Sequence, residues 1–266
     1  MKRSFFFAYG VACYLLFLAT YTYFCLFTGD LWVPKTIDTP TTASPAVAVL
    51  IDLLLVAAFS VQHSVMARPA FKRLWTRLVP NPIERSTYVL LSCVALALLM
   101  WQWRSIDSVV WHVEHPAGRA VLWTLFAAGW LMVPVVSLMI NHFDLFGLRQ
   151  VWLHLLGREY EPLPFRTPML YAHIRHPLYV GWALAFWATP TMTAGHLLFA
   201  VTLTVYMGLA ALVEERDLVA YFGRHYEDYR QRVPRYVPRM FCRRTAVDER
   251  LGLAGHDPAV GAQGAE

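Results

Sequence analysis

Two short segments of the chain place ionisable side chains at the two ends of one long apolar region. The first, YAHIRHPLYVGW (171–182), carries Arg175 and His176 directly before a proline. The second, VEERDL (213–218), carries Glu214 and Glu215 where the apolar region ends. Arginine is a permanent cation with a fixed fork of donors, and histidine exchanges its proton near neutral pH. These residue types suit a pocket that binds a polar ligand and moves a proton.

Three further apolar stretches also carry acids, bases and amides near one end. The residues are Gln62 and His63 in the second stretch, Glu84, Arg85, Ser86 and Tyr88 around the start of the third, and Asn141, His142 and Asp144 at the end of the fourth. Taken singly, a charged group at a helix end extends to the membrane interface and needs no function. Ionisable groups gathered from five segments at one depth indicate a functional site instead. We therefore expect a shared polar pocket.

The composition predicts the elements that must position this pocket. Of 266 residues, 57% are hydrophobic and only 15% are charged, against roughly 25% charged in soluble domains. Apolar runs of about 20 residues predict membrane-spanning helices. The expected fold is all-α, a polytopic integral membrane bundle of five or six transmembrane helices. The expected spans are 5–28, 46–67, 86–103, 120–141, 178–192 and 195–213, the last two short and joined at TPTMTAG.

The basic residues predict how the bundle sits in the membrane. Of the 23 lysines and arginines, only Lys35, Arg104 and Arg119 fall on the side opposite the N-terminus. Loops rich in Lys and Arg stay in the cytoplasm. Both termini and the polar pocket are therefore expected to face the cytoplasm, in a multi-pass protein of the inner membrane.

A helix with an apolar stripe is expected after the last span. The stripe consists of Leu218, Phe222, Tyr226, Tyr229 and Val233. Such a helix lies on the membrane surface or covers the pocket, and Gly223 is a point where it can break. We expect one membrane domain over residues 1–240 and a disordered tail over 241–266, which is rich in Ala and Gly.

Metal and disulfide chemistry are not expected. The four cysteines lie far apart without a C-x-x-C pair, so neither a disulfide framework nor a zinc site follows. His173 and His176 have a spacing that can bind a metal, but Pro177 favours an extended residue before it and separates the two rings. The sequence also gives no sign of nucleic-acid binding or of an obligatory protein partner, and leaves the lipid bilayer as the expected surroundings.

The motifs resemble a known superfamily. RHPLYVG (175–181), an apolar hairpin and EERDLVAYFGRHYEDYRQRVPRYVP (214–238) are together similar to the isoprenylcysteine carboxyl methyltransferase-like membrane enzymes, which include NnrU proteins and phospholipid N-methyltransferases. QHSVMARPAFKR (62–73), IERSTYVL (83–90) and NHFDLFGLRQV (141–151) resemble a narrower group, the bacterial methanethiol S-methyltransferases. This resemblance implies methylation of a small thiol to a thioether, with S-adenosylmethionine as cofactor.

The resemblance also implies roles for individual residues. Residues 141–238 would form the cofactor-binding half, with a turn, a pair of acids and two closing tyrosines: Arg175, His176, Tyr179, Glu214, Glu215, Tyr226 and Tyr229. The arginine suits the cofactor's carboxylate, and the acids suit its amine and hydroxyls.

The thiol must lose its proton in a site where dryness disfavours the anion. We expect His142 to be the base, oriented by Asp144, with His63 as the second candidate. Arg85 would stabilise the thiolate. The remaining polar residues near the thiol are expected to bind substrate: Gln62, Tyr88 and Asn141.

Three other functions fit part of the pattern. A transporter would need polar groups through to the outer face, whereas here they stop at one side. A membrane haem protein would use His63 and His142 as axial ligands. A methyltransferase for prenylcysteine or phospholipid head groups would need a lateral opening for a lipid tail.

Overall fold

Five helices of the computed structural model, which describes residues 1–238, are long and apolar enough to cross a membrane. They are α1 (Lys2–Thr28), α2 (Pro45–Met66), α4 (Asn81–Gln102), α5 (Pro116–Ile140) and α9 (Ala194–Phe222). At 1.5 Å per residue, even the shortest reach about 33 Å, which matches the apolar thickness of a bilayer. The predicted class, a polytopic helical membrane bundle, is confirmed. The expected tail, 241–266, lies outside the described residues.

The predicted span 178–192 is shorter in the structure. Helix α8 (Pro177–Trp187) has 11 residues, or about 16 Å, and the chain then becomes extended. Thr191–Thr193 form strand β2, which pairs antiparallel with β1 (Val109–His112). Threonine is β-branched and favours extended backbone. The bundle therefore has five long helices and a short sixth, and a two-stranded ribbon joins two loops at the same end of the molecule.

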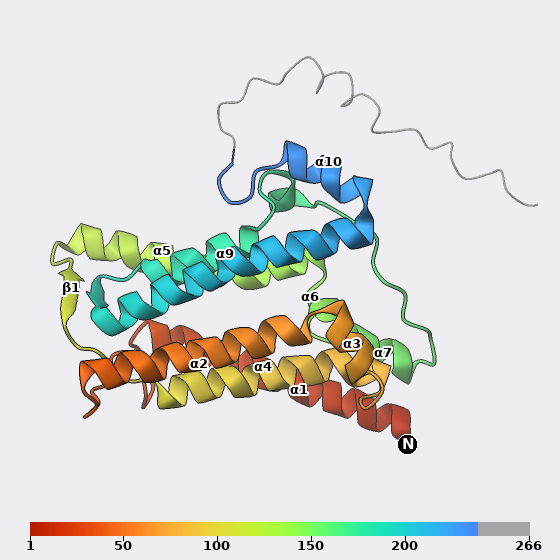
Figure 1. The fold of residues 1–266 in the computed structure, drawn as a ribbon, viewed down its shortest axis with the longest axis horizontal. Helices are drawn as coiled ribbons and strands as arrows, with labels where there is room; N and C mark the ends of the chain where they lie inside the picture. Colours follow the sequence, from red (N-terminus) through yellow and green to blue (C-terminus); the bar gives the residue numbers. More distant parts are fainter. Residues whose placement is uncertain (239–266) are drawn as a thin grey trace, which may run out of the picture.

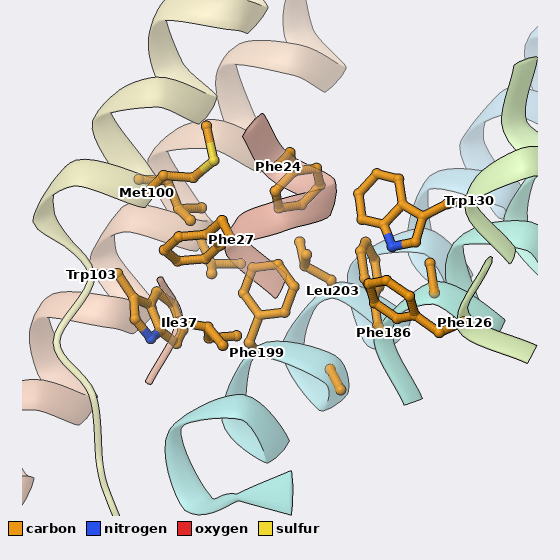
Figure 2. Close-up of a cluster of buried hydrophobic side chains, with 14 of the residues drawn as sticks. Phe24, Phe27, Ile37, Met100, Trp103, Phe126, Trp130, Phe186, Phe199 and Leu203 are labelled. Atoms are coloured by element: carbon orange, nitrogen blue, oxygen red, sulfur yellow. The ribbon is translucent and has the colours of Figure 1, made fainter. Parts of the chain in front are cut away.

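The helices form two layers (Figure 1). Helices α1, α2 and α4 pack together in one layer, and α5, α8 and α9 in the other, while α2 also contacts α9. At the end that carries the ribbon, buried aromatic and aliphatic side chains from both layers form one core (Figure 2). Its labelled members include Phe24, Phe27, Trp103, Phe126, Trp130, Phe186, Phe199 and Leu203. Aromatic side chains bury large apolar areas, so this cluster holds the layers together at one end.

A proline inside α5 creates a second link between the layers. Pro134 has no backbone N–H, so the carbonyl of Trp130 loses its helical partner. The hydroxyl of Tyr21, on α1, donates a hydrogen bond to that carbonyl. One phenol thereby satisfies a buried backbone group and ties α1 to α5.

The opposite end of the bundle carries the short elements. They are α3 (Pro69–Trp75), α6 (His142–Leu145), α7 (Leu148–Leu155), the 3₁₀ helix η1 (Met169–Ala172) and α10 (Arg224–Arg232). Gly147 connects α6 to α7 with φ +86°, and a β-carbon there would lie 2.6 Å from the Ser86 hydroxyl. Gly223, with φ +56°, ends α9 and begins α10. The expected C-terminal helix is α10, and the predicted stripe is divided at this glycine.

Helices α5 and α8 approach each other through glycine, which gives a prediction about stability. A β-carbon on Gly129 would lie 2.8 Å from the carbonyl oxygen of Gly181 and would also press on the Ala185 backbone. We expect Gly129→Ala to lower the free energy of unfolding by about 1–3 kcal/mol, measured as a lower thermal midpoint in detergent. Gly208→Ala is the control, because nothing lies within 4 Å of its added carbon. If both variants lower the midpoint equally, the packing argument is wrong.

Candidate active site

A buried carboxylate organises the first part of the site. Glu215, near the end of α9, has 2% of its surface exposed. Its Oε1 lies 2.9 Å from Nη2 of Arg175 and 3.0 Å from Nε2 of His176. Pro177 occupies the first turn of α8, where its missing N–H costs no hydrogen bond. The turn before α8 and the end of α9 are therefore joined by one charge cluster, with both residues of the opening motif on the same acid.

A second arginine completes this cluster. Arg235 approaches both oxygens of Glu215, with Nε 3.0 Å from Oε1 and Nη2 2.8 Å from Oε2. Its backbone is also held, because His176 N–H donates to the Arg235 carbonyl and Arg175 N–H to that of Pro234. Sequence reasoning did not assign Arg235 a role. The available signal was a single arginine in VPRYVP, just beyond the predicted helix.

Glu214 lies at the edge of the cluster, with Oε2 3.9 Å from Nδ1 of His176. The hydroxyl of Tyr179 donates to Glu214 Oε2 at 2.9 Å, and the Tyr179 ring stacks on His176 at 5.1 Å between centroids. The Glu214 side chain is 44% exposed. This acid therefore retains capacity to accept hydrogen bonds from a ligand, while Glu215 has its acceptors used by protein cations.

The two predicted closing tyrosines lie on α10 beside the turn. Tyr226 and Tyr229 are buried and pack edge-on against Phe165. The hydroxyl of Tyr229 donates to the carbonyl of Tyr171 at 2.6 Å. Burial raises the pKa of Tyr229 to about 12, so the phenol stays protonated at neutral pH. These contacts attach α10 to the segment before the RHP turn.

A cavity of about 310 Å³ lies between the two layers. Most of its wall is apolar, and helices of both layers contribute to it. Among the predicted site residues, four line it: His63, Arg85, Tyr88 and Tyr179. Gln62 and Asn141 do not. Gln62 Nε2 contacts Met66 Sδ at 3.2 Å, and Asn141 Oδ1 accepts from the Asp144 backbone N–H, which caps α6.

The polar part of the cavity wall centres on His63 and Arg85. His63 Nδ1 lies 3.2 Å from the Ser92 hydroxyl, and the Tyr88 hydroxyl lies 3.0 Å from His63 Nε2. Arg85 donates from Nε to the carbonyl of Leu145 at 2.8 Å and lies over the Tyr88 ring. None of the ion pairs within residues 1–238 includes Arg85. Its charge is thus available to an anion in the cavity.

The surroundings of His142 differ from those of His63. Its Nε2 lies 2.8 Å from the Tyr14 hydroxyl and its Nδ1 2.7 Å from the Ser137 hydroxyl. Burial lowers the pKa of His142, so the ring is neutral. Ser137 lines the cavity, but His142 does not. The ring therefore links α1, α5 and α6 from behind the cavity wall, and the two rings needed for haem ligation do not face one space.

Asp144 does not orient His142, contrary to expectation. The carboxylate accepts from Arg149 Nη1 at 3.0 Å and from the Tyr160 hydroxyl at 3.2 Å. Residues two apart on a helix point in different directions, and α6 carries the two side chains to opposite neighbours. Asp144 instead helps to line a polar pocket beside α7, together with Lys72 and His154.

Comparison with known proteins identifies close relatives. The chain is 50% identical to the methanethiol S-methyltransferase of Crocosphaera subtropica over 238 residues, which covers 90% of this chain and 93% of the relative. It is 52% identical to the protein of the same name from Mycobacterium tuberculosis, over 90% and 98% of the two chains. Nurim of Rattus norvegicus is 35% identical over 63% of this chain and 66% of its own. No protein-family model and no solved structure matches.

Proposed function

This chain belongs to the methanethiol S-methyltransferase family, and on that premise we propose that it methylates methanethiol to dimethyl sulfide with S-adenosylmethionine as methyl donor. The donor, when bound, supplies an electrophilic methyl group carried on a positively charged sulfur. The protein's task is to hold that charged molecule at a polar surface while a thiolate approaches from an apolar space.

The charge cluster at the RHP turn has the groups that such a donor requires. Arg235 keeps 33% of its side chain exposed, and its bonds to Glu215 use Nε and Nη2. Its remaining terminal nitrogen, Nη1, suits the donor's carboxylate. Glu214 has acceptor capacity for the amine and ribose hydroxyls. The stacked rings of His176 and Tyr179 offer a flat aromatic surface beside these groups. We propose that these residues, with Arg175, Glu215, Tyr226 and Tyr229 as their support, form the donor site.

One observation carries the proposal. Tyr179 belongs to both parts of the site, because its hydroxyl binds Glu214 while its side chain lines the cavity. The charge cluster at the RHP turn and the apolar cavity therefore meet at one residue. A donor held by the cluster would present its methyl group toward the space that His63 and Arg85 face from the other layer.

We propose that Arg85 stabilises the substrate as a thiolate. A nearby cation lowers the free energy of the anionic form and so lowers the thiol's pKa. The wall is mostly apolar, so the attraction between guanidinium and thiolate is screened less than in solution. The thiol's proton passes to His63. In the tautomer that donates from Nδ1 to Ser92, Nε2 accepts from the Tyr88 hydroxyl, which lines the cavity and so relays the proton from the thiol to the ring.

This assignment separates the two histidines experimentally. We expect His63→Gln to lower kcat/KM for methanethiol by about 100-fold and to remove the low-pH inflection of the rate. We expect His142→Gln to keep that inflection and to lower the thermal midpoint, because it loosens the link between Tyr14 and Ser137. The measurement is the pH profile of kcat/KM at saturating S-adenosylmethionine. If the inflection vanishes only in His142→Gln, then His142 is the base.

The orientation and domain boundaries are part of the proposal. The RHP turn, Glu215 and α10 lie at the end of the bundle that carries most of the basic loops, which supports a cytoplasmic site in a bacterial inner membrane. Residues 1–240 would form one domain. Within it, 141–238 would supply the donor site, while α2 and α4 supply His63 and Arg85.

The direct test follows the methyl group. Purified protein in detergent receives S-adenosylmethionine with a deuterated methyl group, together with methanethiol, and headspace mass spectrometry detects dimethyl sulfide. We expect one deuterated methyl group per product molecule. Prenylcysteine and phosphatidylethanolamine run in parallel as acceptors. Label in either of those, with none in dimethyl sulfide, would overturn the proposal.

A further inference from the structure

The cavity is larger than a one-carbon thiol needs. Its volume is about 310 Å³, whereas an apolar protein cavity of about 150 Å³ already holds benzene. Of the residues assigned above to the donor site, Tyr179 alone borders it. The volume is therefore space on the acceptor side, and methanethiol, with two heavy atoms, would leave most of it empty.

The cavity is elongated, and its two ends differ in polarity. Arg85 and Leu96 both line it from α4, and eleven residues of helix span about 16 Å. Polar groups gather at the Arg85 end, beside Tyr88 and Tyr179. The far end is formed by Phe24, Phe186 and Leu203, which also belong to the buried core (Figure 2). A thiolate held at Arg85 thus has an apolar channel behind its carbon atoms.

We infer that this protein also methylates larger apolar thiols, with ring- or chain-shaped carbon groups of about six carbons. This inference rests on the proposed function, because it uses the same donor and the same reaction. The thiolate sulfur forms a bond to the donor's methyl carbon as the bond from that carbon to the sulfonium sulfur breaks. The thiol's proton goes to His63 and then to water, and the products are a methyl thioether and S-adenosylhomocysteine.

The apolar wall sets the chemical class of these substrates. Each methylene that moves from water into such a space strengthens binding by roughly fourfold. A polar atom in the same place loses its hydrogen bonds to water, since the far wall offers little to replace them. The hydroxyl of Tyr21, which lines the cavity, is already donated to the Trp130 carbonyl. Apolar thiols are therefore favoured over polar thiols of the same shape.

The test compares three thiols on the wild-type protein: methanethiol, cyclohexanethiol and oxane-4-thiol. The two ring thiols share a shape, but the second has an ether oxygen in place of one methylene. We expect kcat/KM for cyclohexanethiol to be at least about one tenth of that for methanethiol, and oxane-4-thiol to be poorer than cyclohexanethiol by about tenfold. A cyclohexanethiol value below that tenth, or equal values for the two ring thiols, overturns the inference while the proposed function stands. No methylation of any thiol overturns both.

A pair of variants locates the larger substrate. Leu96→Trp adds bulk to the cavity wall, whereas Leu98→Trp adds it to the same helix at a side chain that is 45% exposed. We expect Leu96→Trp to lower the ratio of cyclohexanethiol to methanethiol turnover by about tenfold, and Leu98→Trp to leave the ratio unchanged. Methanethiol turnover reports whether each variant folds. Equal ratios in the two folded variants would place the ring outside the cavity and overturn the inference.

Discussion

Glu215→Gln is expected to weaken S-adenosylmethionine binding by about 100-fold, with a matching loss of kcat/KM for that substrate. The carboxylate contacts Arg175, His176 and Arg235 at once and is almost fully buried. The amide that replaces it has no charge and only one acceptor oxygen. Two guanidinium groups then lose their shared counter-ion, and the turn before α8 is no longer fixed against α9. Calorimetric titration with S-adenosylhomocysteine measures the effect.

The same substitution should also destabilise the fold. Removing one partner from a buried ion pair costs about 3–5 kcal/mol, so the thermal midpoint in detergent is expected to fall. Asp217→Asn is the control, because Asp217 pairs with Arg68 at the surface, where the two side chains are 39% and 28% exposed. Exposed pairs contribute little. A Glu215→Gln protein that binds the ligand like Asp217→Asn would contradict the donor-site assignment.

Arg85→Met is expected to lower kcat/KM for methanethiol by about 100- to 1000-fold while the affinity for S-adenosylhomocysteine stays the same. Arg85 lines the cavity and has no carboxylate partner within residues 1–238, so its charge acts on the substrate. Without it, the thiol ionises less readily in the apolar space. The variant's rate should therefore rise with pH over a more alkaline range than that of the wild type.

Arg85→Lys separates charge from geometry. Lysine keeps the positive charge but loses the Nε donor that Arg85 directs to the Leu145 carbonyl. We expect activity between those of the wild type and Arg85→Met. If Arg85→Met retains wild-type kcat/KM at neutral pH, thiolate stabilisation belongs to another residue.

The sequence was most informative where charge met apolar runs. Five long helices followed from hydrophobic stretches, and the acids and bases at the RHP turn and the VEERDL segment meet in space, as the distances at Glu215 show. For the acids and bases, the signal was a residue type that is costly to bury without a partner. The same signal marked His63 and Arg85, and the structure brings these two residues to one cavity with Tyr88 and Tyr179.

Other features depended on contacts between distant segments. The partners of His142 are Tyr14 and Ser137, and Tyr14 is 128 residues away in the sequence. The sequence suggested Asp144 as the partner of His142, because it is only two residues away. In the structure, α6 directs the Asp144 carboxylate to Arg149 and Tyr160 instead. Helix α8 ends early because the chain enters the two-stranded ribbon. The strands of the ribbon have three and four residues, which is too short for an alternation of polar and apolar residues to show in the sequence. Arg235 lies in a loop whose position is fixed by contacts with distant segments, namely the side-chain pairing with Glu215 and the backbone hydrogen bonds from Arg175 and His176.

An experimental structure with S-adenosylhomocysteine bound tests the central claim most directly. The account predicts the amino-acid portion of the ligand beside Arg235 and Glu214, and its sulfur at Tyr179, facing the cavity that Arg85 and His63 line. Density for the ligand away from the RHP turn, or a sulfur atom separated from this cavity by the protein chain, would contradict it.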